Sequence, residues 1–346
     1  MDKIGYIKAT GIWYRNEIKT IKKKVDVPLQ PVYEAFMNAW EAILDKFSVK
    51  NFRNGVINIA IHHSENLTTQ ETGDYDFDKI VVTDNGIGLN DKCYKRLINL
   101  RDDTKQHSNL GTGRVQFIHF FENTTIDSVY KEGKRFKRRK VTLSKNEAFL
   151  KENAIMRLDE IGVSTAINSR TEVTFKNFID VKDREYYSML TIQNLKDEII
   201  KHYLSLFCEY KSNLPHIRIS LVENTKNKEE IDIVSFDIPN PDKEEKILID
   251  YSKLDNNKIV SAGRQEEFQL TAFKRSSSEI KQNAIYLVSK GAIGVSIDIG
   301  SLQKTDEIDG NRYMFLLSGN YLNDSDRDDR GNIRLISAKE FKQQNE

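Results

Sequence analysis

The sequence predicts an α/β protein: a first region built as a two-layer α/β sandwich, followed by a second, α+β region. Three observations support this fold class. Apolar residues recur at helical spacing from Val32 to Phe47, and apolar runs at 56–61 and 80–83 are typical of strands. A loop, another helix and more strands follow up to residue 175. This order of elements is typical of a mixed sheet with helices on one face.

The first region begins with its most regular helix. Pro31 is compatible with a helix start, where its missing N–H costs nothing, and the apolar spacing continues to Phe47. A polar stretch at 101–110 predicts a flexible loop, and Val115 to Phe121 predict a buried helix directly after it. The other elements expected here are strands at 56–61, 80–83, 125–130, 135–143 and 171–175 and a helix at 94–100.

The second region is expected to be a separate domain. A length of 346 residues favours two domains, and we place the boundary so that the first covers 1–182 and the second 183–346. A long helix is predicted at 192–207, and the charged stretches at 224–230 and 239–246 are interpreted as connections. Strands are expected at 217–221, 266–273, 285–288 and 314–317.

Composition limits the classes of function. Hydrophobic residues make up 38% of the chain, enough for a sizeable core, and charged residues make up 30%, yet the net charge is only +1. The overall charge therefore creates no general attraction to nucleic acid or to an anionic membrane. The N-terminus lacks an apolar signal segment, and no run approaches the roughly 18 apolar residues of a membrane span. A cytoplasmic protein is expected.

Glu34 and Asn38 form the first candidate site. They are four residues apart on a predicted helix, so their side chains lie on one face. The carboxamide oxygen of Asn38 is a hard ligand of the kind that Mg²⁺ prefers. The carboxylate of Glu34 is suited to orient and deprotonate a water that attacks a phosphate. A polar helix face in contact with solvent is the alternative interpretation.

A second candidate site follows the strand at 80–83, where the chain reads Asp84-Asn85-Gly86-Ile87-Gly88. The carboxylate of Asp84 can accept a hydrogen bond from an exocyclic amino group such as that of adenine. Gly86 and Gly88 allow the backbone to approach a ring closely. A simple turn after a strand is the alternative.

A third candidate site precedes the buried helix, where Gly111-Thr112-Gly113 come directly before Arg114 and Val115. Free backbone N–H groups and the dipole at a helix N-terminus favour phosphate, and Lys105 upstream adds a positive charge. Thr171 lies on a later strand, and its hydroxyl can support Asp84. The alternatives are a tight turn into the helix and a structural threonine.

Together and in this order, these motifs resemble the GHKL ATPases, which include DNA gyrase B, the large heat-shock chaperones, histidine kinases and MutL. The resemblance covers roughly residues 25–180 and rests on Glu34-x-x-x-Asn38-Ala39-x-Glu41-Ala42, Asp84-x-Gly86-x-Gly88, Gly111-x-Gly113 and Thr171-x-Val173. The chain departs from the family pattern at Ser108-Asn109 and at Arg170, where the family has glycines.

The resemblance implies the Bergerat ATP-binding fold and an ATPase that uses ATP and Mg²⁺. It makes Glu34 the general base, Asn38 the magnesium ligand and Asp84 the adenine contact. The remaining nucleotide-binding residues that it implies are Glu41, Gly86, Gly88, Gly111, Thr112, Gly113 and Thr171. Family members close a lid over ATP and dimerise, so an ATP-dependent homodimer is expected.

In several family members, a domain after the ATPase region supplies a basic residue to the γ-phosphate. The resemblance points to Arg330, in a loop after the strand at 314–317, and leaves Lys304 as the rival. The chain is most similar to chaperone-like bacterial members, some of which occur in multi-gene systems that include defence against phage. A protein partner or effector in such a system is therefore one expectation.

Two other functions stay open. One is an ATP-sensing binding module with little turnover, and the other is a DNA-processing ATPase of the gyrase or MutL kind. Residues 131–140 contain seven Lys or Arg, which is compatible with a nucleic-acid patch. A hairpin with a solvated basic face is the preferred interpretation, because Phe136 is the one aromatic residue in this stretch. His119 is expected to be a packed core histidine.

Overall fold

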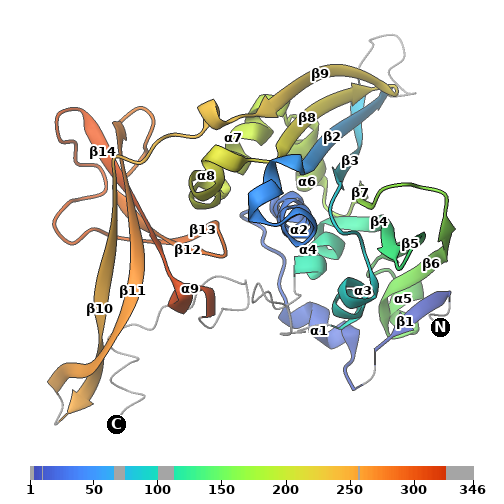
Figure 1. Ribbon diagram of the computed structural model, residues 1–346, viewed down its shortest axis with the longest axis horizontal. Helices are drawn as coiled ribbons and strands as arrows, with labels where there is room; N and C mark the ends of the chain where they lie inside the picture. The colour runs from blue at the N-terminus through green and yellow to red at the C-terminus, as the bar shows by residue number, and fades with distance from the viewer. Residues whose placement is uncertain (1–3, 10, 66–74, 100–112, 256–257, 325–346) are drawn as a thin grey trace. The chain divides into compact units, whose positions relative to one another are not determined.

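The computed structural model describes residues 4–9, 11–65, 75–99, 113–255 and 258–324. Within these ranges the chain has a mixed α/β architecture with two β-sheets and several helices (Figure 1), which confirms the predicted α/β class. The chain divides into two compact units. The first consists of Met1–Ile199 and Ser212–Asp237, and the second of Ile200–Lys211 and Ile238–Glu346.

The first unit is built on a sheet to which the described residues contribute nine strands, in the order β1-β6-β5-β4-β7-β3-β2-β8-β9. The sheet is mixed, because β2 pairs with β8 in parallel and with β3 in antiparallel orientation. The strands are β1 (Gly5–Lys8), β2 (Val56–Glu65), β3 (Tyr75–Asp84), β4 (Phe121–Glu132), β5 (Arg135–Leu143), β6 (Ala154–Ser164), β7 (Arg170–Phe178), β8 (His216–Glu223) and β9 (Lys226–Ile233).

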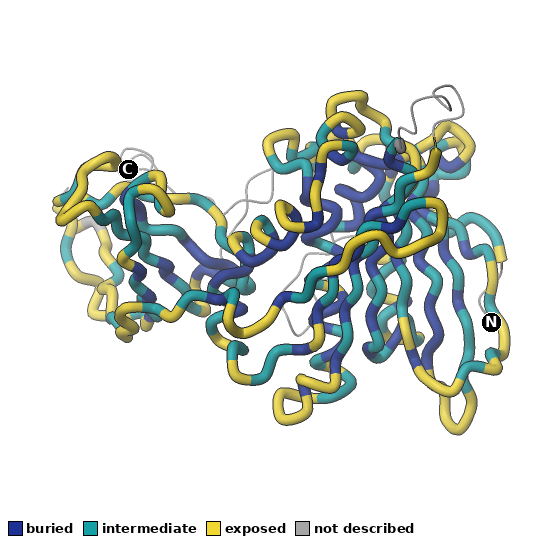
Figure 2. Tube along the Cα trace, turned by 90° about the horizontal axis from the view of Figure 1, so that it is seen from above, coloured by how far each residue is buried: buried dark blue, intermediate teal, exposed yellow. Residues whose placement is uncertain are grey.

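Helices pack against the middle of this sheet. Helix α2 (Gln30–Phe47) contacts β2 and β3, α4 (Gly113–Phe120) contacts β4, and α6 (Val181–Ser188) contacts β3 and β7. Burial alternates along β2 at Ile57, Ile59 and Ile61, as expected for a strand with one covered face, and Figure 2 shows buried residues along the strands. The other helices that begin in this unit are α1 (Tyr14–Thr20), α3 (Asp91–Ile98), α5 (Glu147–Lys151) and α7 (Ile192–His202), with a 3₁₀ turn at Val49–Asn54.

The helices and strands around the candidate site agree with those predicted from the sequence. The helix expected from Pro31 to Phe47 is α2, with its proline in the first turn, and the strand expected to stop at Asp84 is β3. The buried helix expected after Gly113 is α4, although it ends at Phe120 and β4 starts at the next residue. The polar stretch at 101–110 lies outside the described residues.

The predicted domain boundary at 182/183 falls inside the first unit. The strand expected at 217–221 is β8, and it extends the first sheet by pairing with β2 instead of starting a second domain. Its alternating pattern predicts a strand but carries no information about which sheet the strand will join, since that depends on residues far away in the sequence.

The charged stretches at 224–230 and 239–246 were predicted as connections, and this prediction is wrong. β9 covers most of the first stretch, and β10 (Lys243–Asp255) begins in the second. Each stands at one end of the described strand order of its sheet. Edge strands tolerate and favour charged side chains, because one side of the strand faces water, and this explains the misleading composition.

The second unit contains a sheet of five described strands in the order β10-β11-β14-β12-β13. Its core includes Phe268, Leu287, Leu317 and Leu322. The helix predicted at 192–207 is two helices, α7 and α8 (Leu204–Tyr210), because Tyr203 between them has non-helical angles of φ −111° and ψ 26°. The remaining elements are β11 (Lys258–Ser276), β12 (Ala284–Ser289), β13 (Ala292–Ile297), β14 (Asn311–Ser318), α9 (Asn320–Asp324) and 3₁₀ turns at Lys211–Asn213 and Ser235–Asp237.

Candidate functional site

Helix α2 holds Glu34 between the core and the surface. Its apolar side is completely buried through Val32, Phe36, Trp40 and Ile43. Glu34 is half-buried, and its Oε1 accepts a hydrogen bond from Gln30 Nε2 at 2.9 Å. Asn38 follows one turn later and is exposed, so the two side chains share one side of the helix as their spacing predicts.

The first residue of α4 lies against the carboxylate of Glu34. A Cβ atom added to Gly113 would be 2.1 Å from Glu34 Oε2 and 2.5 Å from Glu34 Cδ. A glycine is therefore required for the carboxylate to keep this position. Helices α2 and α4 are in contact, as Figure 1 shows, so the first and third candidate motifs meet although they are far apart in the sequence.

Asp84 ends β3 as a buried carboxylate. Its Oδ1 accepts a hydrogen bond from the backbone N–H of Gly86 at 2.7 Å. Burial raises the pKa of Asp84 to about 7, while the bond from Gly86 and the charge of Lys46 act in the opposite direction. Lys46, on α2, donates a hydrogen bond to the carbonyl of Asn85 at 2.5 Å, and burial lowers the pKa of its ammonium group. The second motif thus contains a buried acceptor that titrates near neutral pH.

The glycines after Asp84 let this loop pack closely against α2 and β4. A Cβ on Gly86 would lie 2.6 Å from the backbone carbon of Ala42, and the N–H of Ile87 donates to the Ala42 carbonyl at 3.0 Å. Gly88 has a φ of +78° and would place a Cβ 2.3 Å from the carbonyl oxygen of Val129. These close approaches require glycine at both positions. The approach at Gly86 attaches the second motif to the helix that carries Glu34, and the approach at Gly88 places the loop against β4.

Thr171 is opposite Asp84 in the register of β7 and β3. Its hydroxyl lies 3.0 Å from Ser128 Oγ, which accepts a hydrogen bond from the N–H of Leu89 at 2.8 Å. Thr171 therefore contributes to a network that holds the chain just after Gly88. Ser128 was not predicted, because a lone serine within a strand carries no signal in the sequence.

Arg139 was counted among the basic residues of the 131–140 hairpin, yet its side chain is only 1% exposed. Its guanidinium group lies 4.1 Å from the ring of Tyr94 and 4.8 Å from the ring of Tyr130. It donates hydrogen bonds to the Leu89 carbonyl at 2.7 Å and to Asp91 Oδ1 at 2.8 Å. Arg139 thus anchors the chain that follows the second motif. The sequence signal that could have indicated its burial is its spacing in β5, where it alternates with two buried apolar residues at 141 and 143.

The predicted hairpin is confirmed as β4 and β5, which turn at Gly133. Two further basic residues of this hairpin are paired with carboxylates. Lys137 contacts Glu132 at 2.5 Å, and Arg138 forms ion pairs with Asp127 and with Glu160, the latter at 3.3 Å. These contacts neutralise part of the basic face of the hairpin, and whether this face binds nucleic acid stays a prediction.

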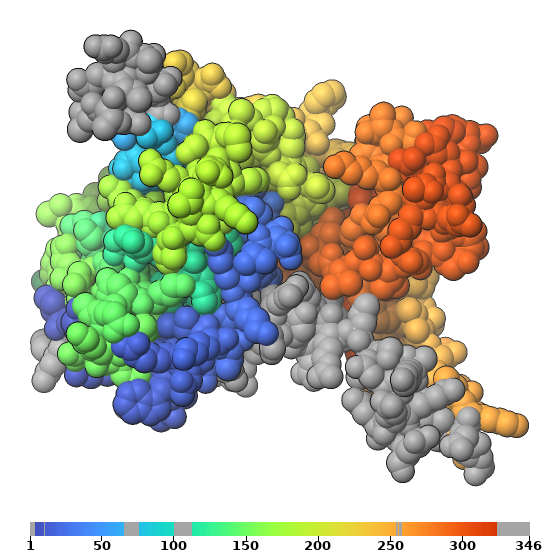
Figure 3. All heavy atoms as spheres, turned by 180° about the vertical axis from the view of Figure 1, so that it is seen from behind, coloured from blue at the N-terminus to red at the C-terminus, as the bar shows by residue number. Residues whose placement is uncertain are grey.

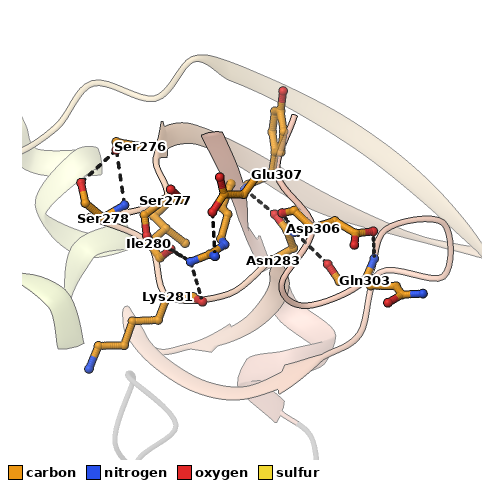
Figure 4. A network of polar contacts seen from close by, with 11 residues as sticks. Ser276, Ser277, Ser278, Ile280, Lys281, Asn283, Gln303, Asp306 and Glu307 are labelled. Carbon is orange, nitrogen blue, oxygen red and sulfur yellow. Dashed lines mark hydrogen bonds and ion pairs between the residues drawn. The ribbon is translucent and has the colours of Figure 1, made fainter. Parts of the chain in front are cut away.

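Lys304 lies in the second unit, on a loop with a defined shape. Its ammonium group pairs with Asp298 at 3.0 Å, and both side chains are exposed. The buried carboxamide of Asn283 holds the loop by donating to the carbonyls of Gln303 at 2.8 Å and of Asp306 at 2.7 Å (Figure 4).

Glu41, another predicted site residue, is buried within α2 of the first unit. Four predicted site residues lie outside the described residues: Lys105, Gly111, Thr112 and Arg330.

The described ranges lack two features. None of the helices there is long and apolar enough to cross a membrane. In the same part of the chain, no group of three or more His, Cys, Asp or Glu residues is arranged to hold a metal ion.

Comparison with known proteins does not assign a family. No protein-family model matches the chain, and no curated protein matches it in sequence. One similar solved structure is described as the N-terminal domain of a DNA repair protein. It has a TM-score of 0.46 and 10% identity, and the match covers 90% of this chain and 93% of that chain. At this level the similarity carries no conclusion about fold or function.

Proposed function

We propose that this chain binds ATP with Mg²⁺, hydrolyses it, and uses the bound nucleotide to control a conformational or dimerisation switch. The observation that carries the proposal is the convergence of three motifs on α2. Glu34 of α2 touches Gly113, and the loop after Asp84 docks on Ala42 of the same helix. These motifs supply a base, a glycine at a helix start and a buried carboxylate that can accept a hydrogen bond from adenine. These are the groups that an ATPase needs.

Asp84 is proposed to bind the adenine base. Its Oδ1 is engaged by Gly86, so its second oxygen can accept a hydrogen bond from the exocyclic amino group. A buried carboxylate is costly without a partner, and an amino group from a ligand provides one. Gly86 and Gly88 hold the backbone in the close, glycine-dependent path that keeps this acceptor in place.

Glu34 is proposed to act as the general base. The N–H groups at the start of α4 are suited to bind phosphate oxygens, since the first N–H groups of a helix lack partners within it. The Glu34 carboxylate lies at this helix start, and Gln30 orients it through Oε1. A water between the carboxylate and a phosphate at this position would be oriented for attack and would lose its proton to Glu34.

The residues present fit a magnesium ion that is held mainly by its nucleotide. Mg²⁺ in such sites takes one or two protein oxygens together with phosphate oxygens and waters. Exposed Asn38, one turn from Glu34, offers one such oxygen and needs no cluster of acidic residues. When bound, the ion would neutralise negative charge on the phosphates. Asn38 would hold it through its side-chain oxygen.

At the level of fold and regulation, we infer that the first unit is a two-layer sandwich of the Bergerat type and that the second unit acts as a transducer. The proposal rests on the motif order and on α2, α4 and α6 packing against the sheet. Lys304 and Arg330 remain the two candidates for sensing the γ-phosphate. A DNA-processing role receives less support, because Arg139 is buried and Lys137 and Arg138 are paired with carboxylates.

The test uses the purified chain and two measurements. We expect ATP turnover that depends on Mg²⁺, measured as phosphate release, and a larger oligomer by light scattering when a non-hydrolysable ATP analogue is added. Binding with turnover well below about one per minute would instead favour an ATP-sensing module, because ordinary enzymes are much faster. If calorimetry detects no binding of ATP or of the analogue, the proposal is wrong.

Gly113→Ala is expected to abolish most turnover while leaving the fold intact. The added Cβ would collide with the carboxylate of Glu34, which is the end of a flexible side chain and can rotate away at little cost. Gly86→Ala would collide with the backbone of α2 at Ala42, so it should lower the melting temperature much more. Thermal unfolding and phosphate release distinguish the two variants. Full turnover in Gly113→Ala would contradict the proposed position of Glu34.

A further inference from the structure

The N-terminal segment at residues 21–24 is attached to α4 by buried polar contacts. Gln116 of α4 is 4% exposed, and both the NH₂ and the oxygen of its carboxamide form hydrogen bonds with this segment. Its Nε2 donates to the Lys22 carbonyl at 2.9 Å, and its Oε1 accepts from the Lys24 N–H at 3.1 Å. Such a pair satisfies both groups of a buried amide, and it fixes the segment relative to the helix in two directions.

His119 provides a second attachment one turn further along α4. Its Nε2 lies 2.6 Å from the Ile21 carbonyl, and its Nδ1 lies 3.3 Å from Lys145 Nζ. Burial lowers the pKa of His119 to about 4, with smaller effects from Lys145 and Lys23, so the ring is neutral at neutral pH. A neutral ring can donate a hydrogen bond from Nε2 to the Ile21 carbonyl and accept one at Nδ1 from Lys145, so both ring nitrogens have a partner. This explains the core histidine that the sequence predicted.

Lys23 provides the third attachment. Its ammonium group lies 2.5 Å from Asp183 Oδ2 and 3.6 Å from Asp180 Oδ2, at the start of α6. It also lies 4.5 Å from the centre of the Phe120 ring, at the end of α4. The run of three lysines at 22–24 resembles a solvated charge run in the sequence. In the structure its middle residue is largely buried, and Figure 3 shows the N-terminal residues, in blue, against green residues of the same unit.

These contacts connect the segment to the proposed phosphate end of the site. Gln116 follows Gly113 by three residues, which is about one helical turn, and Gly113 touches the carboxylate of Glu34. Because Gln116 holds the segment to α4 while Lys23 holds it to Asp183 outside α4, the docked segment favours one position of α4. Since binding free energies are reciprocal, a nucleotide that stabilises this position of α4 must also stabilise the docked segment.

We propose that Gln116 is a positioning residue that couples docking of the segment at residues 21–24 to nucleotide binding at the start of α4. The proposal rests on the ATP-binding function proposed above. It assigns Gln116 no contact with the nucleotide. Its effect passes through the helix, whose position sets the contact between Gly113 and Glu34.

The chain offers a matched control in Asn153. Its side chain also bonds the N-terminal region at both ends: Oδ1 accepts from the Tyr14 N–H at 3.0 Å, and Nδ2 donates to the Ile12 carbonyl at 2.9 Å. Asn153 lies between α5 and β6, outside α4. Gln116→Glu and Asn153→Asp each replace an amide donor with an oxygen of nearly the same size. Aspartate also tolerates the positive φ of 49° at position 153.

The experiment measures hydrogen exchange of the full chain with and without a non-hydrolysable ATP analogue, together with the affinity for the analogue. In the wild type, the analogue should slow exchange in a peptide covering residues 21–27 several-fold. In Gln116→Glu, this protection should disappear and the affinity should fall about tenfold, within the range of ordinary coupling between sites. Asn153→Asp should speed exchange at residues 9–14 and leave the affinity within about twofold of the wild type.

The outcomes separate this proposal from the function on which it rests. If the wild type does not bind the analogue, both fail, and this is known before any variant is made. If the analogue binds but exchange at residues 21–27 is unchanged, or if Gln116→Glu binds normally, the coupling is wrong and the ATP site stands. Should Gln116→Glu fail to fold, Lys23→Met removes the attachment to Asp183 without substituting any residue of α4, and it must also reduce the protection at residues 21–27.

Discussion

Glu34→Gln is expected to lower the rate of ATP hydrolysis by roughly 10²- to 10⁴-fold, the usual contribution of a general base. Nucleotide binding should remain, because the substitution keeps the size of the side chain and an oxygen that can accept from Gln30. The amide cannot take a proton from water at neutral pH. Single-turnover phosphate release measures the rate, and calorimetry with a non-hydrolysable analogue measures the affinity.

Asp45→Asn is the matched control for this variant. Asp45 is exposed on the same helix, and its substitution removes one negative charge from α2 without changing the contact between Glu34 and Gly113. We expect turnover within about twofold of the wild type, as is usual for surface substitutions. Equal turnover in Glu34→Gln and Asp45→Asn would show that Glu34 is not the base.

Asp84→Asn is expected to weaken ATP binding by roughly 10- to 100-fold, since a hydrogen bond to a charged group contributes about 1.5–3 kcal/mol. The Asn oxygen would still accept from the Gly86 N–H, so the amide NH₂ would face the adenine amino group, and two donors would meet. Asp76→Asn, on the same strand, is the control, because Asp76 pairs with exposed Arg184 outside the site. An unchanged affinity in Asp84→Asn would contradict the adenine assignment.

The titration of Asp84 adds a pH signature to the same prediction. Only the ionised carboxyl can accept on both oxygens, one from the Gly86 N–H and the other from adenine, so ATP affinity should rise as the pH increases from 6 to 8 through the pKa of about 7. Stability should change in the opposite direction. The folded state keeps a proton that the unfolded state, with a pKa near 3.8, has lost, so the free energy of unfolding should fall as pH rises from about 4 to 7. Asp84→Asn should remove both dependences.

The sequence predicted the elements around the candidate site well, because their signals are local. Helix α2 is encoded by apolar residues at helical spacing, and β3 by an apolar run that stops at Asp84. For Gly86 and Gly88 the sequence predicted a close approach to a ligand ring, which stays a prediction, while the structure shows close approaches to Ala42 and Val129. The function assigned to these residues remains a prediction, since no matching family or curated relative tests it.

Other features depended on contacts that no local pattern records. The burial of Arg139 required two tyrosine rings from other elements, at positions 94 and 130, and the role of Ser128 required the chain after Gly88 to pass beside β4. The docking of the 21–24 segment is a further example. Its three lysines look solvated in the sequence, while the structure uses the backbone of the run and the side chain of Lys23.

By itself, the sequence determined the α/β class, the elements of the first unit that hold the motifs, and the chemical character of Glu34, Asn38 and Asp84. Only the tertiary structure decided that β8 joins the first sheet, that Gly113 touches Glu34 and that Gln116 holds the N-terminal segment. The physical reason is the range of the interactions. Helix and strand periodicity is set by neighbours within a few residues, whereas strand partners and close side-chain contacts depend on how distant segments pack.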